Sequence, residues 1–402
     1  MRVIESSAFV AVPMAGMTLS QMGAEVIRFD RLEGGLDARR MPYSPSGSSL
    51  FWSGMNKGKK SIAVDMKNPE GKDLITNLIT APGKDAGLFL TNLKVKGWLD
   101  YETLSELRSD IIIVTLKGDR QGRPQVDYTV NPALGIPEIT GHEGSIEPVA
   151  NAIPAWDMIA GNMCVSSLLA AERYRLRHGV GQDVEIALKD VAAAAIGHLG
   201  MIADSTLNTD DRSKAGNALY GAYGKDFLCA DGNRVMIIGL TSRQWSGILK
   251  ATDTTEQFKN LENEKNINLK DEATRWKWRH EITAILEPWF KTRAVEDFAR
   301  DFDNTGLTWS VFRSVKEALE FDPDLSEDNP LFKKIKQPEA GEFLVPRHPA
   351  NFSKVDNTEA KGAPALGEHT EEILGDILHL SDIEISNLFD KGVVASPTYN
   401  KN

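Results

Sequence analysis

The sequence predicts an α/β protein in which a large domain with a parallel sheet is followed by a second domain. Three observations support this prediction: a βαβ pattern at the N-terminus, alternating strand and helix signals up to about residue 203, and a polar break after it. The length of 402 residues and the 41% content of hydrophobic residues allow more than one buried core.

The predicted elements follow the chain in regular alternation. The first unit is a short strand at 3–4, a helix at 14–22 and a strand at 25–30. Further strands are expected at 60–64, 86–90, 111–116 and 182–187, and helices at 69–79, 101–105, 157–177 and from 188 to 203. Such alternation favours parallel strands with helices on both faces of the sheet.

A polar stretch without periodicity, DSTLNTDDRSKA at 204–215, predicts a linker and a domain boundary. Beyond it we expect a strand at 234–239, helices near 244–250 and 275–289, and a closing helix at about 368–378. The segment RWKWRH at 275–280 combines basic and aromatic residues, as single-strand nucleic-acid sites do. Helical spacing puts Trp276 and Trp278 on different faces, which favours a partly buried amphipathic helix instead.

Composition argues against several classes of protein. A net charge of −11 disfavours nucleic-acid binding and a polybasic membrane surface. The two cysteines form no CxxC pair, and no HExxH or other metal-ligand spacing occurs among the seven histidines, so neither a disulfide framework nor a metal site is expected. Without a signal-like start or a run of about 18 apolar residues, the chain is expected to be cytoplasmic and outside the membrane.

Common catalytic motifs are missing from the chain. It contains no GxGxxG, no P-loop GxxxxGK[ST] and no GxSxG, which argues against nicotinamide, ATP and α/β-hydrolase enzymes. A nucleophile must therefore be sought among carboxylates. Basic residues that could meet a polyphosphate gather in the first hundred positions, although a solvated, charge-mixed face explains them equally well. They are Arg28, Arg31, Arg39, Arg40, Lys57, Lys59, Lys60, Lys67, Lys94 and Lys96.

Asp157 stands out among the carboxylates because it opens the long apolar helix predicted at 157–177. Its simplest role is a helix N-cap that accepts a backbone N–H. The same position suits chemistry, since a helix N-terminus favours the ionised carboxylate and nearby N–H groups could stabilise an oxyanion. The local sequence alone does not choose between the two roles.

The chain resembles class III CoA-transferases, the family that includes formyl-CoA transferase, carnitine CoA-transferase and α-methylacyl-CoA racemase. Segments in the family's order and spacing extend over nearly the whole chain. These are ESSAFVAVPMAGMTLSQMGAEVIRFD at 5–30, NKGKKSIAVDMKNPEGK at 56–72, PAWDMIAGNM at 154–163, AAERYRLRHGVGQDVEIALKD at 170–190 and APALGEHTEEIL at 363–374.

The resemblance implies an open, Rossmann-like parallel sheet in a large domain built from both chain ends, with a smaller α+β domain inserted. It places the N-terminal part of the large domain at 1–203, a linker at 204–216, the small domain at about 217–315, and the C-terminal return at 316–402. It also implies that two ring-like subunits interlock as a homodimer.

The family's catalytic aspartate falls on Asp157. Its CoA-contacting positions, with Arg31 and Lys67 as phosphate partners, fall on Val10, Ala11, Arg31, Val64, Lys67, Asn92, Leu93, Lys94 and Lys96. The family's racemases carry a histidine where this chain has Val126, so proton abstraction at an α-carbon lacks its usual group.

The resemblance implies that Asp157 attacks an acyl-CoA thioester and carries CoA to another carboxyl group. Within the family, the resemblance implies mesaconyl-CoA as substrate, with CoA migrating from C1 to C4 of the same molecule. The alternative is transfer between separate molecules, for example from succinyl-CoA to a free dicarboxylate. No metal or redox cofactor is expected, because coenzyme A enters as part of the substrate.

Overall fold

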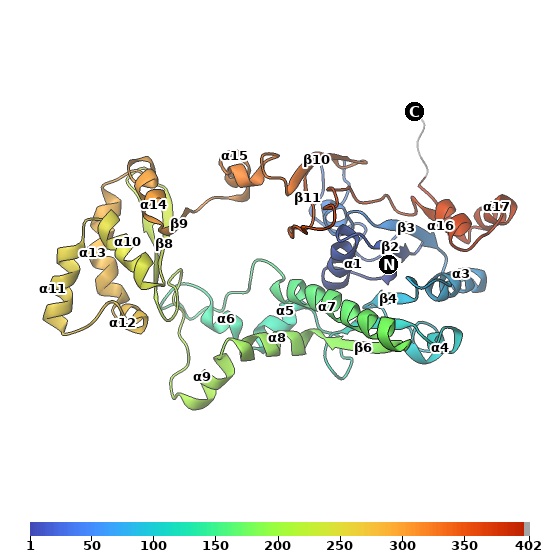
Figure 1. Cartoon of the computed structure of the whole chain (residues 1–402), viewed down its shortest axis with the longest axis horizontal. Helices are drawn as coiled ribbons and strands as arrows, with labels where there is room; N and C mark the ends of the chain where they lie inside the picture. Colours follow the sequence, from blue (N-terminus) through green and yellow to red (C-terminus); the bar gives the residue numbers. More distant parts are fainter. Residues whose placement is uncertain (398–402) are drawn as a thin grey trace. The chain divides into compact units, whose positions relative to one another are not determined.

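The large unit of the protein is built around a seven-stranded sheet (Figure 1). The structure, a computed structural model, describes residues 1–397. The strand order is β12-β3-β2-β1-β4-β5-β6, and all neighbours are parallel except β12 and β3. The strands are β1 (Arg2–Ser6), β2 (Glu25–Asp30), β3 (Lys60–Val64), β4 (Leu88–Thr91), β5 (Ile112–Lys117), β6 (Gln182–Ala187) and β12 (Val394–Ala395). This topology confirms the predicted α/β class.

Helices cover both faces of this sheet. On one face lie α3 (Pro69–Thr80), α4 (Tyr101–Leu107), α16 (Thr370–Asp376) and α17 (Asp382–Asp390). Their buried side chains, among them Ile75 and Ile373, share a core with Ile4 and Phe89 of the sheet. The sheet residues of this core alternate with buried residues such as Val3 and Leu88, so the strands are apolar on both faces.

On the other face, α1 (Ala11–Gln21) packs against α7 (Ala155–His178). Gly161 permits the close approach, because a Cβ at this position would lie 2.7 Å from the carbonyl oxygen of Ala11. The beginning of α7 therefore lies close to the beginning of α1. The remaining elements of this unit are α2 (Leu50–Met55), α5 (Asp127–Ala133), α8 (Leu188–His198), α9 (Met201–Leu207), η2 (Pro323–Leu325), β10 (Phe332–Gln337) and β11 (Gly341–Pro346).

The C-terminal part of the chain returns to the large unit. β12 pairs antiparallel with β3, and the backbone N–H of His369 donates a hydrogen bond to the carbonyl of Ser61 at 2.9 Å. Compact packing accordingly assigns residues 1–134, 151–207 and the described residues from 323 onward to one unit, and residues 135–150 and 208–322 to another. Nothing in the hydrophobic pattern had indicated that 135–150 belong with the second unit.

The second unit contains a three-stranded antiparallel sheet and an aromatic core. Its strands are β7 (Tyr223–Leu228), β8 (Arg234–Gly239) and β9 (Thr308–Val311). Its helices are α6 (Ile136–Ile139), α10 (Ser242–Ala251), α11 (Thr255–Lys265), α12 (Glu272–Lys277), α13 (Arg279–Lys291), η1 (Val295–Asp297), α14 (Ala299–Thr305) and α15 (Val315–Phe321). The helix expected at 275–289 is thus divided at Trp278. Arg275 is buried and donates hydrogen bonds to the carbonyls of Gly239 and Leu269.

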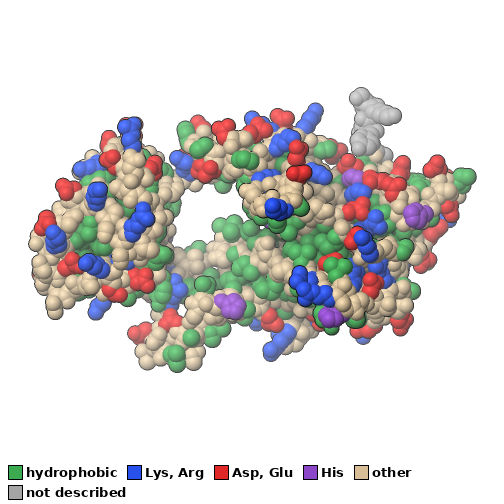
Figure 2. Space-filling model, viewed as in Figure 1, with side chains coloured by type: hydrophobic (Ala, Val, Ile, Leu, Met, Phe, Trp, Pro, Cys, Tyr) green, Lys and Arg blue, Asp and Glu red, His purple; other side chains and the backbone are tan. Residues whose placement is uncertain are grey.

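The surface is consistent with the charge-mixed composition. In the face shown in Figure 2, basic and acidic side chains are interspersed over both units. Within residues 1–397, no helix combines the length and apolar character needed to cross a membrane.

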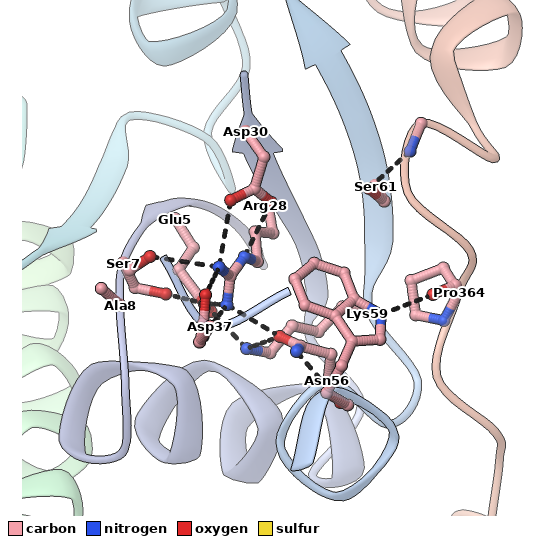
Figure 3. Close-up of polar contacts among 12 residues, drawn as sticks. Glu5, Ser7, Ala8, Arg28, Asp30, Asp37, Asn56, Lys59, Ser61 and Pro364 are labelled. Atoms are coloured by element: carbon pink, nitrogen blue, oxygen red, sulfur yellow. Dashed lines mark hydrogen bonds and ion pairs between the residues drawn. The ribbon is translucent and has the colours of Figure 1, made fainter. Parts of the chain in front are cut away.

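A buried cluster of charges lies where β1 and β2 end (Figure 3). Arg28 is 1% exposed and pairs with Asp30 at 2.8 Å and Asp37 at 2.7 Å, while Lys59 pairs with Glu5 at 2.7 Å. The rest of the Arg28 guanidinium is satisfied by the carbonyl of Ser7, the side-chain oxygen of Asn56 and the ring of Trp52, whose centre is 4.6 Å away. The cluster therefore joins the segments that follow two neighbouring strands.

Removing the arginine is expected to destabilise the large unit strongly. Arg28→Met leaves Asp30 and Asp37 buried without their cation, and breaking a buried pair in this way typically costs about 3–5 kcal/mol. The matched control is Lys391→Met, which removes an exposed ion pair with Glu70 and should cost less than about 1 kcal/mol. Urea unfolding followed by circular dichroism measures both. Equal losses in the two variants would contradict the assigned importance of the cluster.

Candidate active site

The strand order predicts where a ligand can bind. From β1 the chain proceeds to β2 and β3 on one side, then crosses to β4, β5 and β6 on the other. In open α/β sheets, ligands bind outside the carboxyl ends of the strands at the point where the order reverses, because the loops on either side diverge there. In this protein that point lies between β1 and β4.

A pocket of about 1230 Å³ lies at this point of the large unit. Its walls come from the segments that follow β1, β4 and β5, and from the start of α7. Seven of the ten sequence-predicted site residues line it, namely Val10, Ala11, Asn92, Leu93, Lys94, Lys96 and Asp157. Residues far apart in the sequence are therefore brought together around one cavity.

The other three predicted residues lie outside the lining of this pocket. Arg31 directly follows β2 and Lys67 lies three residues after β3, and both are exposed. Their segments follow parallel strands of the same sheet, so they are at the same edge as the pocket. Val64 is the last residue of β3 and is fully buried, so its side chain belongs to the core.

The segment after β1 is held in an unusual conformation. Phe9 has a φ of 68°, in the left-handed region that non-glycine residues seldom occupy. Asn92 clamps the preceding residue, since its side-chain oxygen accepts from the N–H of Ala8 at 3.0 Å and its amide donates to the carbonyl of Ala8 at 2.9 Å. A strained backbone conformation persists where surrounding contacts enforce it, as the hydrogen bonds of Asn92 do here. In this conformation Phe9 and Val10 line the pocket.

Asp157 lies in the first turn of α7 and faces this pocket, but it is not the helix N-cap. The N-cap is Pro154, which makes no side-chain capping bond. The carboxylate of Asp127 serves instead, accepting from the N–H groups of Trp156 at 2.7 Å and Asp157 at 3.2 Å. The capping role considered for Asp157 is therefore wrong, because a residue 30 positions earlier already supplies it. The two N–H groups donate to Asp127 rather than facing an oxyanion.

The environment of Asp157 changes its acidity. The pKa of Asp157 is raised to about 6, first by burial and then by the negative charge of Asp127, while the positive charge of Arg40 opposes both effects. The pKa of Asp127 is itself raised by burial, against the two N–H groups that it accepts. A half-buried carboxylate with a raised pKa beside a cavity is a common property of catalytic acids, bases and nucleophiles.

The pocket also contains basic residues that the sequence reading missed. Lys117, Arg120 and Arg123 belong to the segment KGDRQGRPQ, which runs on from the end of β5. A glycine- and proline-containing loop with three cations after a buried strand was a usable signal, because strand carboxyl ends share one edge of the sheet. Glu185 balances part of this charge by pairing with Lys117 and, at 3.5 Å, with Lys94.

Asp127 is a further residue that the sequence reading missed. It lies at the start of α5, is 1% exposed, and its role depends on contact with a helix that begins 28 residues later. The adjacent Val126 lines the pocket with Asp157 and has no group that could accept or donate a proton.

The arrangement can hold an anionic ligand beside a reactive carboxylate. Lysine and arginine side chains on the loops after β4 and β5 suit phosphate groups, and the apolar Phe9, Leu93 and Val126 line the cavity with Asp157. Among residues 1–397, no three His, Cys, Asp or Glu side chains are grouped so that they could bind a metal ion.

Comparison with known proteins identifies the family. Residues 1–370 match the model of CoA-transferase family III. The chain is 50% identical over 398 residues to 2-methylfumaryl-CoA isomerase from Chloroflexus aurantiacus, covering 99% of this chain and 97% of that protein. It is 26% identical to human succinyl-CoA:glutarate CoA-transferase, over 98% of this chain and 89% of that one.

A solved structure agrees with the fold. The CAIB/BAIF family protein from Brucella suis superposes with a TM-score of 0.76 at 23% identity, covering 94% of this chain and 98% of that one. The resemblance found in the sequence is confirmed: this chain belongs to CoA-transferase family III.

Proposed function

We propose that this protein converts 2-methylfumaryl-CoA, also called mesaconyl-C1-CoA, into mesaconyl-C4-CoA by moving CoA within one molecule. The observation that carries the proposal is the 50% identity, over 99% of the chain, to a 2-methylfumaryl-CoA isomerase. A half-buried Asp157 in a pocket large enough for a bulky thioester supports it. Coenzyme A is then part of the substrate, and no metal or redox cofactor takes part.

In the first half of the reaction, CoA moves onto the enzyme. A carboxylate oxygen of Asp157 attacks the C1 thioester carbonyl, which forms a mixed anhydride and expels CoA thiolate. The thiolate then attacks the aspartyl carbonyl of the anhydride. This step leaves CoA as a thioester on Asp157 and releases the C1 carboxylate of mesaconate.

In the second half, CoA returns to the other end of the same molecule. The C4 carboxylate of mesaconate attacks the aspartyl thioester, forming a second anhydride and again expelling CoA thiolate. The thiolate attacks the C4 carbonyl and restores the Asp157 carboxylate. Because mesaconate stays bound, the capture step is intramolecular and benefits from its high effective concentration.

The other predicted residues have supporting roles in this proposal. Val10, Ala11, Asn92, Leu93, Lys94 and Lys96 would contact CoA from the pocket wall, whereas Val64, which is fully buried in the core, would support β3 from within. Arg31 and Lys67 would reach the phosphates of CoA from the same edge of the sheet. The assembly is expected to be the interlocked homodimer implied by the family, in the cytoplasm.

Asp157→Ala is expected to lower turnover of mesaconyl-CoA by more than about 10³-fold, since no covalent carrier remains. Free CoA should still bind, as calorimetry can show. Hydroxylamine added during turnover should trap the wild-type enzyme as a hydroxamate on Asp157, detectable by mass spectrometry. Asp190→Ala is the matched control, because Asp190 also lies in the first turn of a helix but is exposed and outside the pocket. An active Asp157→Ala enzyme would contradict the proposal.

The rate should depend on pH through Asp157. Only the ionised carboxylate attacks, so kcat/KM is expected to fall about tenfold per unit below pH 6 and to level off above it. In Asp127→Asn a negative neighbour is lost, so the midpoint should move to lower pH. A profile with the same midpoint in both proteins would show that the observed titration belongs to another group.

Isotopic labelling distinguishes transfer within a molecule from transfer between molecules. When mesaconyl-C1-CoA is offered together with labelled free mesaconate, the C4 product should remain unlabelled by mass spectrometry. Label in the product would instead support an intermolecular transferase, the activity named for the human relative that is 26% identical.

A further inference from the structure

Arg40 is an arginine with unused donors beside Phe9, a residue of the pocket that contains Asp157. A guanidinium carries five N–H donors. No hydrogen bond or ion pair joins those of Arg40 to any other group in residues 1–397, and the side chain is exposed. Arg28, in contrast, is fully buried and paired with two carboxylates.

Aromatic rings fix the position of Arg40. Its guanidinium carbon lies 5.4 Å from the ring centre of Phe9 and 5.1 Å from that of Phe51. These distances are typical of cation–π contacts, which orient the guanidinium while leaving its edge donors open. Phe9 lines the pocket with Asp157, so the cation contacts a residue of the pocket wall, although Arg40 itself is not part of the lining.

The backbone on both sides of this contact is anchored. Ser49 donates a side-chain hydrogen bond to the carbonyl of Arg40 at 2.5 Å. Asp37, three residues before Arg40, is tied to Arg28, whose guanidinium also binds the carbonyl of Ser7, two residues before Phe9. The buried cluster thus supports both the arginine and the ring that it contacts.

We propose that Arg40 binds the free carboxylate of the substrate, so that the site selects thioesters of dicarboxylic acids. This inference rests on the proposed function, in which both substrate and product carry one carboxylate that is not attached to CoA. That carboxylate must come near Asp157, where two acidic side chains, Asp157 and Asp127, already repel it. The positive charge of Arg40 lowers the pKa of Asp157. The unpaired N–H donors of its planar guanidinium suit a carboxylate, which can accept two hydrogen bonds from them.

The same cation serves both halves of the reaction. In each half of the reaction, the carboxylate at the end of mesaconate that is not reacting lies against Arg40, while the reacting end faces Asp157. A rotation of the bound dicarboxylate then exchanges the two ends without releasing it. Phosphates of CoA are the competing ligand for Arg40, but Lys94, Lys96, Lys117 and Arg120 already line the part of the pocket outside β4 and β5.

Binding of two thioesters with the same carbon chain tests the proposal. Succinyl-CoA carries a distal carboxylate and butyryl-CoA does not. Calorimetry in an Asp157→Asn background, where no transfer occurs, should show that Arg40→Gln weakens succinyl-CoA binding by about 10- to 100-fold. Binding of butyryl-CoA and free CoA should change less than about twofold. Arg40→Lys should retain part of the preference.

Arg39→Gln is the matched control, since Arg39 is also exposed but its guanidinium contacts no aromatic ring within residues 1–397. Equal weakening of all three ligands by Arg40→Gln would overturn the proposal and assign Arg40 to CoA phosphates. An unchanged succinyl-CoA affinity would overturn it as well. Failure of the proposed isomerase function would be seen separately, because the wild-type enzyme would then not turn over mesaconyl-CoA. The binding comparison would still be valid in that case.

A pH profile provides a second readout with Asp157 intact. Because the charge of Arg40 favours the ionised carboxylate, Arg40→Gln should move the midpoint of kcat/KM for mesaconyl-CoA to higher pH, opposite to Asp127→Asn. Arg40→Lys should keep the wild-type midpoint. A merely structural role for Arg40 predicts no such opposite shift, and a profile unchanged in Arg40→Gln would overturn the proposal.

Discussion

The buried pairing of Arg28 with Asp30 and Asp37 is the constraint on which the candidate site depends. Charges of this kind are costly to remove from water, and they are tolerated only when every partner is held in place. In this protein the partners lie on the segments that follow β1 and β2, which carry Phe9 and Arg40 respectively. The buried ion pairs that stabilise the large unit therefore also hold the segments that carry Phe9 and Arg40.

A second long-range contact determines how Asp157 is presented. Because Asp127 accepts the first free N–H groups of α7, the side chain of Asp157 is not used to cap its own helix. The same contact places a second negative charge beside Asp157 and helps to raise its pKa, while Arg40 acts in the opposite direction. An acidic and a basic side chain thus shift the pKa of Asp157 in opposite directions.

Much of the fold could be predicted from the sequence, because parallel strands and their helices leave strong local patterns. The helix expected at 157–177 is observed as α7 at 155–178, and the strand expected at 60–64 is β3. Errors occurred where tertiary contacts override periodicity. Arg275, bound to the carbonyls of Gly239 and Leu269, lies just before the break that divides the helix expected at 275–289 into two.

The sequence by itself determined the class of fold and the family, since these depend on local patterns and on segments matched in order, and it predicted a carboxylate as the nucleophile. Only the tertiary structure decided which residues meet. It brought Asp127 and Arg40 to Asp157 and added the loop after β5 to the pocket, and it left Arg31, Val64 and Lys67 outside the lining. Asp127 and Arg40 are 30 and more than 100 positions from Asp157, and such neighbours leave no periodic signal because they depend on the sheet order.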